Sequence, residues 1–172
     1  FWVSGQYKGK GYANELLEEC IRDAKAQDKL GLVILSSPKK QPFLSDPKYL
    51  KYKGFQLCDK ANPYFELLYL PFTEIASKPS FKSCCKEGAI ATPGYVLYYS
   101  DQCPYAEKYS VLVADTAKEQ GEEVKLIKFT SSEEARNAPS PFTTYSLFHN
   151  GAFITNEILS VPKFIKLMKG TL

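Results

Sequence analysis

The sequence has few of the residues from which metal sites are built. Its single histidine, His149, has no second histidine to act with, and none of its five cysteines stands in a C-x-x-C pair. Zinc sites need three or four such ligands, so the sequence predicts no metal site. The cysteines are odd in number and irregularly spaced, and no secretory signal is visible, so we expect free thiols in the cytoplasm.

Long apolar runs and an excess of one charge are also missing. No stretch approaches the roughly 18 apolar residues of a membrane span. The 22 lysines and arginines and the 19 aspartates and glutamates give a net charge of +3, with both signs mixed along the chain. We therefore expect neither a membrane nor a nucleic acid as partner. Met168 is the only methionine, so we expect the chain to be a piece of a longer protein.

The segment GQYKGKGYAN (residues 5–14) has the composition of a phosphate-binding loop. A P-loop requires G-x-x-x-x-G-K-[ST], but here the first two glycines are one residue too close, and glycine follows Lys10. A dinucleotide fingerprint requires G-x-G-x-x-G, and Asn14 stands where its last glycine belongs. The pattern [QR]-x-x-G-x-[GA] is complete, with Gln6, Gly9 and Gly11.

That last pattern, placed between a strand and a helix, resembles the pyrophosphate loop of the GNAT family of N-acetyltransferases. Glycines let backbone N–H groups converge on an anion, and the positive end of the following helix adds to the attraction. The resemblance implies that acetyl-CoA is the cofactor. The residues implied to hold it are Val3, Gln6, Tyr7, Lys8, Gly9, Lys10, Gly11 and Tyr12. The alternative is a glycine-rich turn that only joins a strand to a helix.

The rest of residues 1–75 resembles the C-terminal half of the same fold. We expect the end of a strand at residues 1–3, a helix from Tyr12, strands at 32–35, 56–59 and 65–70, and a short helix before Gly54. The first helix is predicted to bury a stripe of apolar residues: Leu16, Leu17, Cys20, Ile21 and Ala24. The strands and helices that begin the GNAT fold are absent. We therefore expect this fragment to be inactive alone, its sheet completed by the missing N-terminal half or by a second copy.

The phrase YLKYKGF (residues 49–55) resembles the GNAT helix-to-strand junction F-Y-E-K-x-G-F. The tyrosine of that junction often protonates the leaving CoA thiolate in the family, but Leu50 stands at its position. Tyr49 and Tyr52 flank it and are rotated away by about 100° per residue on a helix. We therefore expect ordinary packing for both, and the sequence identifies no acid or base for acetyl transfer.

A second unit is predicted after a linker at residues 76–92, which lacks periodicity and contains Cys84 and Cys85. In residues 93–172 we expect strands at 95–99, 124–129, 143–148 and 152–155, with helices after residues 103, 131 and 160. Asn150 and Gly151 between apolar strands indicate a hairpin, and His149 is expected to be exposed there without a catalytic role. This element order is that of the thioredoxin fold. The predicted class is therefore α/β, a GNAT C-terminal half plus a small thioredoxin-like domain.

The motif Cys103-Pro104-Tyr105-Ala106 resembles the C-P-Y-C turn of glutaredoxins. Cys103 is predicted to lie just before a helix N-terminus, where the helix dipole favours the thiolate, with Pro104 at the first helical position. Ala106 replaces the second cysteine, so only monothiol chemistry remains, with glutathione or with Cys84 or Cys85 as resolving thiol. Cys103 is thus a candidate redox residue, or otherwise a relic or a binding residue.

The two predicted units in this order resemble the YoaP-like acetyltransferases of bacteria, as does SPFTTYSLFHNGAFITNEILS (residues 140–160). The resemblance implies an acetyl-CoA-dependent N-acetyltransferase acting on a small-molecule or peptide amine. Two alternatives stay open. One is a monothiol thiol-exchange or thiol-binding protein with a regulatory CoA domain, and the other is a non-catalytic acyl-CoA sensor.

Overall fold

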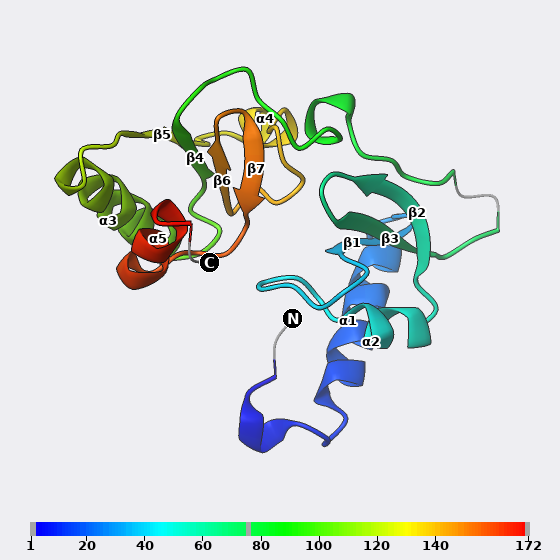
Figure 1. Cartoon of the computed structure of the whole chain (residues 1–172). Coiled ribbons are helices and arrows are strands. Elements are labelled where there is room, and N and C mark those ends of the chain that lie inside the picture. Colours follow the sequence, from blue (N-terminus) through cyan, green and yellow to red (C-terminus); the bar gives the residue numbers. More distant parts are fainter. Residues whose placement is uncertain (1–2, 75–76, 171–172) are drawn as a thin grey trace.

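The computed structural model describes residues 3–74 and 77–170, which form a mixed α/β structure with two separate sheets (Figure 1). We call them the N-terminal sheet and the C-terminal sheet. No helix of the described residues is long and apolar enough to cross a membrane. The predicted strand at residues 1–3 lies partly outside the described residues, and Val3 itself is in no strand.

The N-terminal sheet contains β1 (Gly31–Ser36), β2 (Gln56–Ala61) and β3 (Phe65–Pro71) in the order β1-β3-β2, all antiparallel. Two helices pack on it, α1 (Tyr12–Ala26) and α2 (Pro47–Tyr52). The α2 helix begins where the Asp46 carboxylate accepts a hydrogen bond from the Lys48 N–H, and Gly54 follows its end with φ 88°. Leu17, Leu50, Phe55 and Leu68 form the buried core between helices and sheet.

The stripe predicted on α1 is only half correct. Leu17 and Ala24 are buried and Ile21 is half-buried, as expected. Leu16 is 42% exposed and Cys20 is also exposed. These two residues lie on the flank of the helix that the three strands of the sheet do not cover. Leu16 and Cys20 therefore belong to an uncovered surface, not to the core.

The C-terminal sheet has the order β5-β4-β6-β7. Its strands are β4 (Tyr95–Tyr99), β5 (Val124–Lys128), β6 (Tyr145–His149) and β7 (Ala152–Thr155), and only the β4–β5 pair is parallel. The helices are α3 (Ala106–Glu119), α4 (Ser132–Arg136) and α5 (Val161–Met168). Figure 1 shows α3 and α5 beside each other on one side of this sheet. Leu97, Val113, Leu147 and Phe164 are fully buried between them.

The expected hairpin is present, but His149 is not an exposed turn residue. Asn150 (φ 48°) and Gly151 (φ 86°) make the turn, as predicted. His149 is the last residue of β6 and is half-buried. It lies opposite Tyr95 in the β4–β6 register, and the two rings stack with centroids 4.0 Å apart. The prediction missed this pairing because the two residues are distant in sequence.

The two sheets meet at Asn156, which is 1% exposed. Its Oδ1 accepts a hydrogen bond from the Tyr64 hydroxyl (2.6 Å), and its Nδ2 donates to the carbonyl of Pro42 (2.8 Å). The ring of Phe153 packs edge-on against both Phe65 (5.4 Å) and Tyr64 (5.9 Å). The loop before α2 and the β2–β3 turn are thus fixed against the end of β7.

The segment that connects β3 to β4 also contacts both sheets. The Asp59 carboxylate accepts hydrogen bonds from the Phe81 N–H (2.7 Å) and the Lys86 ammonium (3.1 Å). Further along, Ala89 bridges Ala152 and the Ile90 N–H donates to the Gly151 carbonyl. This segment includes a short 3-10 helix, η2 (Ser83–Cys85).

Candidate functional site

The loop before α1 takes a conformation that requires glycine at two positions. After a short 3-10 turn, η1 (Gly5–Tyr7), Gly9 and Gly11 have φ values of 77° and 89°. Side chains rarely adopt this left-handed region. A Cβ at either position would meet no atom within 4 Å. Backbone conformation, and not crowding, therefore selects glycine here.

The same loop presents unused backbone donors at the start of α1. Gly11 is the N-cap and has no side chain to cap the helix. No described residue accepts a hydrogen bond from the N–H groups of residues 9–13, whereas those of Tyr7 and Lys8 are used within the loop. The first turn of a helix carries a partial positive charge. Free donors next to that charge are the usual setting for binding an anionic group.

A cavity of about 380 Å³ lies against these donors. Six of the eight residues predicted to hold the cofactor line it: Val3, Tyr7, Lys8, Gly9, Gly11 and Tyr12. Ala13 and Asn14 complete the wall. The other two predicted residues do not line it. Gln6 is exposed on η1, and the Lys10 ammonium lies 5.5 Å from the centre of the Tyr7 ring.

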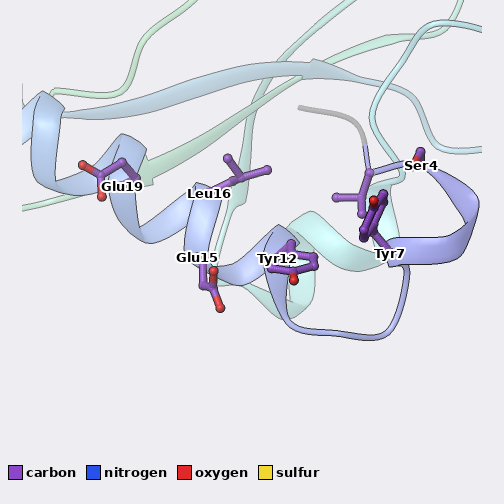
Figure 2. Close-up of a pocket in the computed structure, with 7 residues that line it drawn as sticks. Ser4, Tyr7, Tyr12, Glu15, Leu16 and Glu19 are labelled. Atoms are coloured by element: carbon purple, nitrogen blue, oxygen red, sulfur yellow. The ribbon is translucent and has the colours of Figure 1, made fainter.

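A second cavity, of about 580 Å³, continues along α1 and shares Val3, Tyr7 and Tyr12 with the first. Figure 2 shows Tyr7 on the loop and Tyr12 on the helix on opposite sides of the gap, with Leu16 further along α1. The two rings meet edge to face with centroids 6.2 Å apart. Together the two cavities have free backbone N–H groups at one end and aromatic and aliphatic side chains along the rest of the wall.

The expectation of ordinary packing holds for Tyr49, which packs against the core around Leu50, but not for Tyr52. Leu50 itself is 3% exposed and belongs to the core. Tyr52 is 82% exposed. The Tyr49 hydroxyl reaches the first turn of α1, where it lies 3.0 Å from the carbonyl of Ala13 and 3.2 Å from the Asn14 side-chain oxygen. Burial, with a contribution from Glu18, raises the pKa of Tyr49.

The turn around Cys103 differs from the prediction in where its helix begins. The first residue of α3 is Ala106 and its N-cap is Tyr105, so Pro104 precedes the helix and is not its first residue. The Ala106 N–H donates to the carbonyl of Cys103 (3.0 Å). Cys103 is half-buried. Cys103 thus lies three residues before the first residue of α3.

The turn that carries Cys103 is fastened to the segment before β6. The side chain of Gln102 donates to the Thr143 hydroxyl and accepts from that of Thr144, both at 3.1 Å. Thr143 and Thr144 thus lie across from the cysteine turn.

The two candidate resolving thiols have different surroundings. Cys84 is exposed and its sulfur lies 3.9 Å from the carbonyl of Arg136. Cys85 is buried, its thiol donates to the Lys82 carbonyl (3.3 Å), and burial raises its pKa. No disulfide links any of the five cysteines. Among residues 3–74 and 77–170, no three His, Cys, Asp or Glu side chains gather as metal ligands would.

Two further polar residues were not predicted from the sequence. Glu66 is the one acidic residue in the apolar strand FELLYLP, and it is 4% exposed. Asn156 is the buried amide at the meeting point of the sheets. An acidic residue inside an apolar strand is a usable signal for the first. Nothing in the sequence around Asn156 distinguishes it from an ordinary turn residue.

The chain is similar to one known protein family and to one curated protein. The YoaP-like family matches residues 124–166, which confirms the predicted resemblance over that part of the chain. The Bacillus subtilis (strain 168) protein "Uncharacterized N-acetyltransferase YoaP" is 41% identical over 167 residues. That alignment covers 97% of this chain and 66% of the relative, so the chain spans about two thirds of the relative's length. No solved structure matches the chain.

Proposed function

We propose that this chain is the coenzyme-binding part of an acetyl-CoA-dependent N-acetyltransferase of the GNAT family. The observation that carries the proposal is the loop at residues 4–13, with two left-handed glycines and free N–H groups at the start of a 15-residue helix. The Bacillus subtilis relative, which is named as an N-acetyltransferase, supports this proposal. The order β1-β3-β2, with helices before β1 and before β2, is the one expected for the C-terminal half of a GNAT fold.

In this proposal the backbone N–H groups of residues 9–13 bind the pyrophosphate of CoA. Lys8, which lines the same cavity, offsets part of its charge. The pantetheine arm runs beside Tyr7 and Tyr12. The neutral amine nitrogen of the acceptor would attack the thioester carbonyl, the C–N bond would form and the C–S bond would break. The nitrogen would lose one proton and the CoA thiolate would take one up, so that CoA leaves as the thiol.

The exposed flank of α1 and the free edge of β1 suggest that the N-terminal sheet is part of a larger one. Among the described strands, β1 pairs only with β3. Val33 in the middle of β1 is 56% exposed, and Leu16 and Cys20 are exposed on α1. An open edge next to apolar surface is a template for a further strand. We propose that another segment of a longer chain, or a second copy, supplies it.

A second candidate function comes from the C-terminal sheet. Its order, β5-β4-β6-β7 with one parallel pair, is that expected for a thioredoxin-like fold, and Cys103 follows β4 as in a glutaredoxin. The bonds from Gln102 to Thr143 and Thr144 fix this turn opposite the segment before β6. This supports a monothiol-exchange or thiol-binding role for Cys103, beside or instead of acetyl transfer.

The test is an assay of the full-length natural protein with acetyl-CoA and a panel of primary amines, read by mass spectrometry of the amines. Acetylated amine above the level of a boiled-protein control supports the enzyme. CoA binding without transfer to any amine supports a sensor instead. A mixed disulfide between Cys103 and glutathione, absent in Cys103→Ser, supports the thiol role.

A further inference from the structure

The row of free backbone donors in the loop before α1 ends at Asn14. The N–H groups of residues 9–13 have no acceptor among the described residues, whereas the Asn14 N–H donates to the Gly11 carbonyl at 2.8 Å. Asn14 nevertheless lines the same cavity of about 380 Å³, together with Lys8 and Gly9. The residue is exposed, so a molecule in the cavity can reach it. Asn14 can therefore add a donor to this site only through its side-chain amide.

The hydroxyl of Tyr49 holds the oxygen of this amide. Tyr49 lies on α2, and its ring packs against the buried core of the N-terminal sheet. The hydroxyl hydrogen is shared between the carbonyl of Ala13 (3.0 Å) and Oδ1 of Asn14 (3.2 Å). Three-centre hydrogen bonds of this kind are common at helix termini. A residue anchored in the core thus contacts the wall of the loop cavity across 35 positions of sequence.

This contact leaves the amide nitrogen of Asn14 for another partner. The oxygen and the nitrogen of an amide point in different directions, and the nitrogen carries two donors. With the oxygen turned to Tyr49, no described residue accepts a hydrogen bond from the Asn14 Nδ2. Phosphate oxygens are acceptors without donors of their own, and they bind where N–H groups converge at a helix N-terminus. A phosphate in the cavity would therefore supply the acceptor that this nitrogen lacks.

We propose that the Asn14 amide nitrogen donates a hydrogen bond to a phosphate oxygen of CoA, and that Tyr49 is the positioning residue that holds the amide in the required orientation. The inference rests on the proposed function, in which the neighbouring backbone N–H groups bind the pyrophosphate. An amide that is free to rotate would also turn its oxygen toward the anion and repel it. A hydroxyl that donates to that oxygen favours the one orientation in which the nitrogen serves the ligand.

The test is calorimetry of CoA binding to the full-length natural protein and four variants. Asn14→Ala removes the amide, Tyr49→Phe removes only the hydroxyl that holds it, and a third variant carries both changes. Tyr52→Phe, on the same helix at a residue that is 82% exposed, is the matched control for loss of a tyrosine hydroxyl. We expect Asn14→Ala to bind CoA about fivefold more weakly, as for one hydrogen bond to a charged group at an exposed site. Tyr52→Phe should bind CoA as the natural protein does.

The double variant separates a positioning role from support of the fold. If Tyr49 acts through Asn14, Tyr49→Phe weakens CoA binding in the natural protein but causes no further loss in Asn14→Ala. Equal losses from Tyr49→Phe in both backgrounds overturn the positioning role, and undiminished CoA affinity in Asn14→Ala overturns the whole proposal. Because Asn14 is exposed, Asn14→Ala is decisive even if Tyr49→Phe does not fold. A natural protein that binds no CoA would instead overturn the proposed function, and this inference with it.

Discussion

The most informative single substitution at the junction is Asn156→Ala. It removes the acceptor of the Tyr64 hydroxyl and the donor to the Pro42 carbonyl at a residue that is 1% exposed. The hydroxyl of Tyr64, a half-buried residue, would lose its partner at a cost of up to about 3 kcal/mol, and losing an ordinary hydrogen bond costs about 1 kcal/mol. Pro42 is exposed, so losing the hydrogen bond to its carbonyl is expected to cost only about 1 kcal/mol. We therefore expect Asn156→Ala to lower the free energy of unfolding by roughly 2–4 kcal/mol.

The assay is urea unfolding followed by circular dichroism, with two comparison variants. Tyr64→Phe breaks only one of the two bonds and is expected to cost about 1–3 kcal/mol. Asn137→Ala removes an exposed amide, bonded to Lys82, and is expected to change stability by less than about 0.5 kcal/mol. If Asn156→Ala costs no more than Asn137→Ala, the junction described here does not exist in solution.

Three further outcomes are expected. The hydrogen bonds from Lys86 and from two backbone N–H groups lower the pKa of Asp59. The stability that these bonds add is therefore present above the usual aspartate pKa and is lost as the pH falls through the lowered pKa. Asp59→Asn should accordingly make the melting temperature less dependent on pH in the acid range. Iodoacetamide should label exposed Cys84 before buried Cys85, whose pKa is raised, and mass spectrometry showing the reverse order would contradict the burial. Val33→Lys on the β1 edge should reduce self-association in light scattering if a second copy covers that edge, and no change would exclude the second copy.

The helices and strands were predictable because their signals are local. The apolar periodicity of α1, the run that became β1, and the Asn150-Gly151 turn each lie within one short segment. The two left-handed glycines of the loop before α1 were predictable for the same reason, since they lie within one short segment. Six of the eight predicted cofactor residues line one cavity because of this continuity.

The features that the sequence did not reveal depend on distant residues. Asn156 bonds to partners 92 and 114 positions away. His149 stacks on Tyr95 because β6 pairs with β4. Glu66 is buried by the combined packing of three strands and α2. Leu16 and Cys20 match the apolar period of α1, but period alone does not say how wide the covering sheet is.

The start of α3 shows a smaller limit of local reasoning. A proline after Cys103 fits the first position of a helix, yet the chain makes one more turn and the helix starts at Ala106. Helix ends predicted from sequence commonly shift by a few residues. Here the helix begins three residues after Cys103 instead of one.

The central claim is that the loop before α1 binds CoA, and calorimetry of the full-length protein with CoA tests it most directly. Gly9→Asp places a carboxylate beside the free N–H groups at a φ of 77°. Gly121→Asp is the matched control, with the same charge, a φ of 79° and open space around it, after the end of α3. We predict that CoA binds the natural protein and Gly121→Asp equally and that Gly9→Asp binds at least tenfold more weakly. Equal CoA affinity in all three proteins would contradict the assignment of the loop.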